Sequence, residues 1–156
     1  MYPLILTRRI LISAPKESVR LYLSDLKRIA EYEPKVRKVE VSGPSSGLVE
    51  VSGRFLGFSW SGSFKALFTA DGGYRAEMVQ GPLPHVAGGY HLRPVHGGTV
   101  VTHEERYLLP WLFVPLRFLL SRWLGRTIER ELGAIKEGAE RLHRQTQLNQ
   151  IESAYQ

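Results

Sequence analysis

Residues 59–68 read Ser-Trp-Ser-Gly-Ser-Phe-Lys-Ala-Leu-Phe and alternate between two kinds of side chain. Aromatic and small apolar residues fall on one face, whereas three serines and Lys65 fall on the other. This period of two indicates a β-strand that has one buried face and one face in water. A sheet covered on a single side is typical of antiparallel architectures, and we expect a helix to be the cover.

Further segments of β-forming residues surround this strand between residues 35 and 108, separated by turns rich in glycine, proline, serine and aspartate. Parallel strands need crossovers of a dozen residues or more, so connections this short predict six antiparallel strands in a meander. An earlier β-rich segment, residues 5–13, ends at Ala14-Pro15, where proline suits the first turn of a helix. We expect two short helices there, the second of them capped by Asp25.

Residues 114–145 have the apolar spacing of one long helix, about 45 Å in length, with Pro115 in its first turn. Seven apolar residues project onto one stripe, as expected for a helix lying across a sheet: Leu120, Leu124, Ile128, Leu132, Ile135, Ala139 and Leu142. Residues 146–156 are polar, and we expect them to fray. The interpretation is therefore a single domain over residues 1–146 and a polar tail over residues 147–156.

The two halves of this helix differ in charge. After Arg126 acidic residues, Glu131 among them, balance basic ones, as on a solvated surface. Before it the only charges are Arg117, Arg122 and Arg126, and further apolar residues lie beside the core stripe. We expect another apolar group to cover that wider surface.

The composition excludes several classes of protein. The chain has 156 residues and no cysteine, so it holds no disulfide framework, thiolate metal site or cysteine nucleophile, and we expect a cytoplasmic location. We identify no export signal and no membrane-spanning segment. The formal net charge is +6, but the basic residues are dispersed, so we interpret them as a solvated surface and expect no specific nucleic-acid partner.

Three segments resemble one superfamily. Residues 10–26 contain a strand, Ala-Pro, a helix and an aspartate-led second helix; residues 32–36 read Tyr-Glu-Pro-Lys-Val; and Gly98-Thr99 opens an alternating strand followed by a proline-containing link and a long helix. This order resembles the helix-grip superfamily, which includes the birch pollen allergen, START lipid-transfer domains, polyketide cyclases and dehydrases, and coenzyme Q-binding proteins. The resemblance implies an α+β helix-grip fold, with a curved seven-stranded antiparallel sheet around a long C-terminal helix.

A sheet and a single helix cannot close fully on each other, so the resemblance also implies an internal cavity. By alternation, the aromatic and leucine residues of the strands face inward, and two leucines of the helix lie opposite. Each of these side chains is also consistent with simple core packing. The predicted apolar lining is Trp60, Phe64, Tyr90, Leu92, Tyr107, Leu120 and Leu124.

The spacing from Val101 to Tyr107 places His103 and Glu105 on the same inward face. Because an unpaired buried carboxylate is costly, Glu105 should have a partner, a raised pKa or access to water. Three interpretations stay open: a structural hydrogen bond, the polar end of a ligand pocket, or catalysis with His103 as general base and Glu105 or Tyr107 assisting. The other histidines form no ligand pair, so we expect no metal and no cofactor.

The proline-broken segment at residues 107–116 should lie at one end of the cavity. It is either a packed corner or a portal that contacts an anionic membrane or a second copy of the chain. The portal residues would be Trp111, Phe113, Arg117, Arg122 and Trp123. The leading hypothesis is binding or transport of an apolar small molecule such as a lipid, isoprenoid, quinone or polyketide. A cyclase/dehydrase-like enzyme using His103 and a protein- or ribosome-interaction module are the alternatives.

Overall fold

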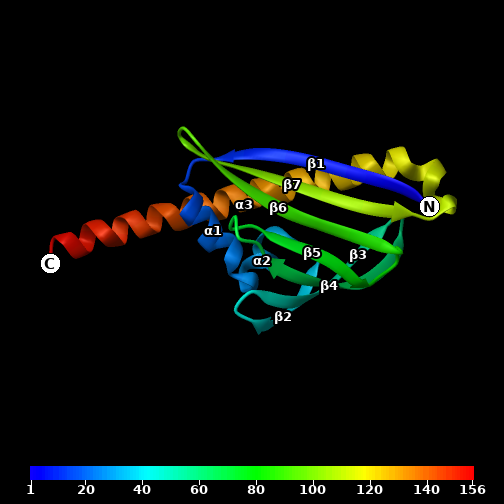
Figure 1. Ribbon diagram of the computed structural model, residues 1–156, viewed down its shortest axis with the longest axis horizontal. Coiled ribbons are helices and arrows are strands. Elements are labelled where there is room, and N and C mark those ends of the chain that lie inside the picture. The colour runs from blue at the N-terminus through cyan, green and yellow to red at the C-terminus, as the bar shows by residue number, and fades with distance from the viewer.

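The computed structural model describes all 156 residues, and its strands form one curved antiparallel sheet that wraps around the C-terminal helix (Figure 1). The predicted order of strand, short helices, six strands and long helix is confirmed. The elements are β1 (Tyr2–Ile12), α1 (Lys16–Ser24), η1 (Leu26–Arg28), α2 (Ile29–Tyr32), β2 (Val36–Gly43), β3 (Ser46–Phe55), β4 (Phe58–Phe68), β5 (Tyr74–Gln80), β6 (His85–Val95), β7 (Gly98–Leu109), η2 (Trp111–Leu116) and α3 (Arg117–Ala154).

The strand order β1-β7-β6-β5-β4-β3-β2 is a meander in which the first strand returns to pair with the last. The ladder between β1 and β7 runs from Tyr2 opposite Leu109 to Ile12 opposite Thr99. The first strand begins at Tyr2, earlier than the expected residue 5, because β7 is long enough to pair with all of it. Pro3 is tolerated there because β1 is an edge strand.

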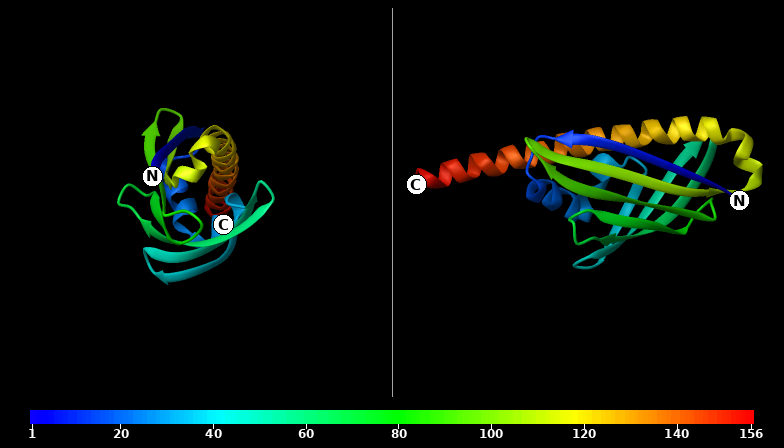
Figure 2. Two further views of the ribbon diagram at one scale, coloured as in Figure 1. Left: turned by 90° about the vertical axis from the view of Figure 1, so that its right-hand side faces the viewer. Right: turned by 45° about the horizontal axis from the view of Figure 1, so that its top comes forward.

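The long helix α3 lies along the concave face of the sheet, as the end-on view shows (Figure 2). The predicted stripe is confirmed: six of its seven residues are buried, and Leu142 packs against the core from its edge. The short helices α1 and α2 pack against α3 and complete the closed end of the domain. None of the helices combines the length and apolar content that crossing a membrane requires.

The bounds of the long helix differ from the prediction at both ends. Residues 111–116 form the 3₁₀ helix η2, and α3 begins at Arg117, after Pro115, which has no backbone N–H to donate. At the other end the predicted frayed segment is helical as far as Ala154. Residues 146–154 contain neither glycine nor proline, so nothing in the sequence stops an established helix there. This end of α3 extends beyond the sheet (Figure 1).

Candidate functional site

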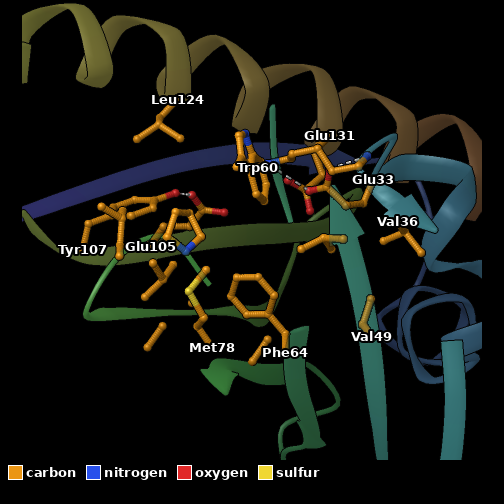
Figure 3. Close-up of a pocket in the computed structure, with 18 of the residues that line it drawn as sticks. Glu33, Val36, Val49, Trp60, Phe64, Met78, Glu105, Tyr107, Leu124 and Glu131 are labelled. Carbon is orange, nitrogen blue, oxygen red and sulfur yellow. Dashed lines mark hydrogen bonds and ion pairs between the residues drawn. The ribbon is translucent and has the colours of Figure 1, made fainter. Parts of the chain in front are cut away.

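The space between the sheet and the first half of α3 is a cavity of about 530 Å³. Of its 31 lining residues 22 are hydrophobic, and the lining comes from α2 and the segment after it, β2 to β7, the β5–β6 connection, η2 and α3 (Figure 3). A volume of this size is in the range of sites that bury most of a small organic molecule. The hollow interior inferred from the fold is therefore present.

Eight of the nine residues predicted to line a ligand site lie around this cavity. Trp60 and Phe64 line it from β4, and Leu120 and Leu124 line it from α3. Leu92 does not line the cavity; it is buried in the packed core opposite Val101, in the part of β6 where α1 packs against the sheet. The strand alternation predicted its inward direction but not the short helix that occupies the space beside it.

His103 and Glu105, which their spacing placed on one inward face, contact each other directly. The His103 Nε2 atom is 2.9 Å from Glu105 Oε1, and its Nδ1 atom is 3.1 Å from the carbonyl oxygen of Gly89. The hydroxyl of Tyr107 donates to the second carboxylate oxygen of Glu105. A carbonyl can only accept, so Nδ1 carries a proton, and the imidazole is fixed in one orientation with Nε2 toward the carboxylate.

Glu131 is an acidic cavity residue that the sequence interpretation missed. It was assigned to the solvated surface of the helix, but it is 5% exposed and lines the cavity. The signal was its spacing, because residue 131 lies three residues after Ile128 and four before Ile135, within the buried stripe. The hydroxyl of Tyr90 donates to Glu131 Oε1, while Oε2 is buried and has no hydrogen-bond partner.

Burial and neighbouring charges shift the ionisation of these groups. Burial raises the pKa of Glu131 to about 8. The negative charges of Glu33 and Glu105 raise it further, whereas the positive charge of His103 acts in the opposite direction. Burial by itself lowers the pKa of His103, but the hydrogen bond to Glu105 and the charge of Glu131 outweigh this and raise it above its usual value. The site therefore holds protons that exposed groups would release.

Three tyrosines extend the polar end of the cavity towards α2. The rings of Tyr90 and His103 stack with centroids 4.1 Å apart, Tyr74 packs on Tyr90, and the hydroxyls of Tyr74 and Tyr32 are 3.2 Å apart. The sequence interpretation placed only Tyr90 in the site, because Tyr32 and Tyr74 lie next to turns where alternation is broken.

The predicted portal residues divide into two groups. Phe113 and Trp123 line the cavity, and Trp123 packs on Phe55 with ring centroids 5.0 Å apart. Trp111 is 70% exposed, Arg122 is exposed, and Arg117 stacks over Phe118 at 4.5 Å. Phe58, after a β3–β4 turn with positive φ at Leu56 and Gly57, adds a lining side chain that is 79% exposed. This end of the cavity thus has an apolar rim with arginines beside it.

One cluster has the residue types of a metal site. His103, Glu105 and Glu131 each offer an atom that lies within 4.8 Å of the other two. An imidazole and two carboxylates are suitable ligands for a divalent cation. These are the residues that would hold a metal ion, and none of the other four histidines belongs to such a group.

Solved structures with the same fold come from several bacteria. A protein from Thermus thermophilus shares 19% identity at a TM-score of 0.75, over 87% of this chain and 97% of that one. The Zhui aromatase/cyclase from Streptomyces sp. R1128 shares 16% identity at a TM-score of 0.75, over 90% and 95%. A START superfamily protein from Mycobacterium smegmatis shares 15% identity at a TM-score of 0.68, over 88% and 98%. These similarities show the helix-grip fold.

The sequence itself defines the family. No curated protein matches the chain. The profile of the family described as "Polyketide cyclase / dehydrase and lipid transport" matches residues 3–140, nearly all of the sheet and most of α3. The match covers every residue around the cavity, from Ile29 to Glu131. The chain belongs to the polyketide cyclase/dehydrase and lipid transport family.

Proposed function

We propose that the protein binds or carries an apolar small molecule, such as a lipid, an isoprenoid, a quinone or a polyketide-like compound, inside this cavity. The observation that carries the proposal is the internal volume of about 530 Å³ with its predominantly hydrophobic lining. Burying apolar surface contributes about 25 cal/mol per Å², so such a molecule gains free energy by leaving water. The family, which includes lipid-transport proteins, supports this function.

Native mass spectrometry of the purified protein tests the proposal. We expect the protein to carry extra mass from a co-purified small molecule. If solvent extraction first removes that molecule, the protein should gain the mass of an added apolar dye such as Nile red. The aromatic side chains Trp60 and Trp123 line the cavity, so bound dye should also quench their fluorescence. An extracted protein that takes up no apolar compound would refute the function.

Catalysis is the second candidate, favoured by the chain of contacts from Tyr107 through Glu105 to His103. In its neutral form His103 would remove a proton from a carbon beside a carbonyl group of the ligand. The enolate would attack a second carbonyl of the same molecule, and Tyr107 would return a proton to the new alkoxide. Loss of water would complete a cyclisation and dehydration.

Replacement of His103 by alanine separates the two candidates. If His103 is the base, H103A should lose turnover of a polyketide-like substrate while its affinity for the ligand stays within about threefold. The matched control is H96A, because His96 is exposed and is not one of the residues that line the cavity. Loss of binding and of turnover together would indicate a structural role for His103.

The apolar rim supports a further part of the proposal, namely that the ligand enters from an anionic membrane. Trp111, Leu112 and Phe118 are each at least 70% exposed, and Arg117 and Arg122 lie beside them. Apolar side chains beside arginines are typical of surfaces that insert into the headgroup region of a bilayer. A second copy of the chain is the other partner that could cover this surface.

A further inference from the structure

The charged side chains of the cavity do not balance. Three acidic residues line it, Glu33, Glu105 and Glu131, but only two basic ones, Lys35 and His103. Glu33 pairs with Lys35 at 3.6 Å, and Glu105 pairs with His103 at 2.9 Å. Glu131 is left without a cationic partner, so its ionised form gives the cavity a net charge of minus one.

Glu131 also has an unused hydrogen-bond acceptor. Its Oε2 atom is buried and has no partner, whereas buried polar atoms in folded proteins are ordinarily paired. The carboxylates of Glu131 and Glu105 approach the same point from opposite walls, one from α3 and one from β7. One oxygen of each carboxylate and one ring nitrogen of His103 all lie within 4.8 Å of one another. A small group with several N–H donors and one positive charge would satisfy both the charge and the unpaired oxygen.

We propose that the cavity selects apolar molecules that carry a protonated amine at one end, with the ammonium group bound between Glu131 and Glu105. This inference rests on the proposed function and names the class of ligand for the same site. An ammonium has three donors and no acceptor, so it suits a site whose free polar atoms are carboxylate oxygens. A carboxylate head group, such as that of a fatty acid, would lie beside the charge of Glu105 and has no N–H to offer Glu131, so we expect it to bind least well.

The cavity also has the shape for a linear ligand with this polar end. Leu120 and Glu131 both line it and are eleven residues apart on α3, a rise of about 16 Å. Phe113, in the η2 segment before α3, and Trp123 add aromatic side chains to the lining. An alkyl chain of about that length can extend along the helix from the ammonium site to the aromatic rim.

Three amphiphiles with the same dodecyl chain test the inference: dodecylamine, dodecanol and dodecanoate. Their dissociation constants are measured at pH 7 by displacement of Nile red, in EDTA so that no metal contributes. We expect dodecylamine to bind at least about tenfold more tightly than dodecanol, and dodecanoate to bind most weakly.

The variant E131Q keeps the shape of the side chain and removes its charge. We expect its preference for the amine over the alcohol to fall below about threefold. The control E137Q makes the same change on the exposed face of α3 and should keep the full preference.

Three results would overturn the inference. Two of them are equal binding of dodecanoate and dodecylamine to the wild type and an amine preference that E131Q leaves unchanged. The third is a wild-type protein that binds the amine no better than the alcohol. If dodecanol binds but dodecylamine binds no better, the inference fails while the proposed function stands. If neither the dye nor any of the three amphiphiles binds, the proposed function fails as well.

Discussion

Replacing Glu131 by glutamine should make the protein more stable at pH 7. Burial raises the pKa of Glu131 from 4.5 to about 8, so the unfolded chain releases this proton near pH 4.5 while the folded chain keeps it. Between these values the folded state binds more protons than the unfolded state. Its free energy of unfolding therefore falls as pH rises from about 4.5 to 8, and is constant above that range with respect to this group.

The magnitude follows from the size of the pKa difference. One pKa unit corresponds to about 1.4 kcal/mol, so at pH 7 the buried carboxyl lowers the free energy of unfolding by about 3 kcal/mol. Glutamine removes this loss but leaves its amide N–H groups unpaired, which costs about 1 kcal/mol. The net gain of E131Q is thus about 2 kcal/mol at pH 7. Near pH 5, where the loss is small, the two proteins should be about equally stable.

Urea unfolding followed by circular dichroism at pH 5, 6, 7 and 8 measures this difference. The pKa of His103 is also raised, so His103 loses its stabilising contribution as pH rises. The free energy of unfolding of E131Q should therefore still fall with pH, but less steeply than that of the wild type. The control E137Q should follow the wild type, because Glu137 is exposed. A variant that is less stable than the wild type at pH 7, or whose stability falls equally steeply with pH, would refute the buried, protonated state of Glu131.

Three further predictions concern the cavity, the core and the rim. The variant L124W should fill the cavity and weaken Nile red binding at least about tenfold without a fall in melting temperature; unchanged binding would place the ligand elsewhere. The variant G138A should lose about 1–3 kcal/mol of unfolding free energy, because its new methyl group would overlap the Tyr22 hydroxyl, whereas G133A meets open space and should lose none in urea titrations. The variant F118S should sediment less with phosphatidylserine vesicles than the wild type, and equal sedimentation would exclude Phe118 from the membrane contact.

The fold could be predicted because its main signals are local. The alternation around Phe64 and the stripe through Leu124 each depend on a period that the chain displays over ten residues or more. The helix ends were predicted less well. Pro115 was assigned to the first α-helical turn but lies in η2, and the polar residues after Gln145 continue the helix because composition alone does not end one.

The sequence predicted those site residues whose side chains follow the alternation of a strand. It missed residues whose type suggested exposure although their position in the element is buried. His103 and Glu105 were found together because two residues of one strand share a face. Leu92 has the correct face but lies outside the cavity, since the position of α1 depends on tertiary packing that no strand pattern contains. Glu131 has the correct position on the helix, but acidic residues are so often exposed that its residue type outweighed its spacing.

The position of Glu131 is informative because the protein gains no stability from it. The carboxyl costs about 3 kcal/mol at pH 7, its Oε2 atom bonds to no other group, and an apolar residue on the same stripe would pack beside Ile128 and Ile135 at no such cost. Typical domains are stable by only about 5–15 kcal/mol, so a loss of this size is a large fraction of the total. Uncompensated polar groups of this kind are expected at functional sites rather than in structural cores. Because Glu131 lines the cavity, we infer that the missing partner is a group that the ligand brings.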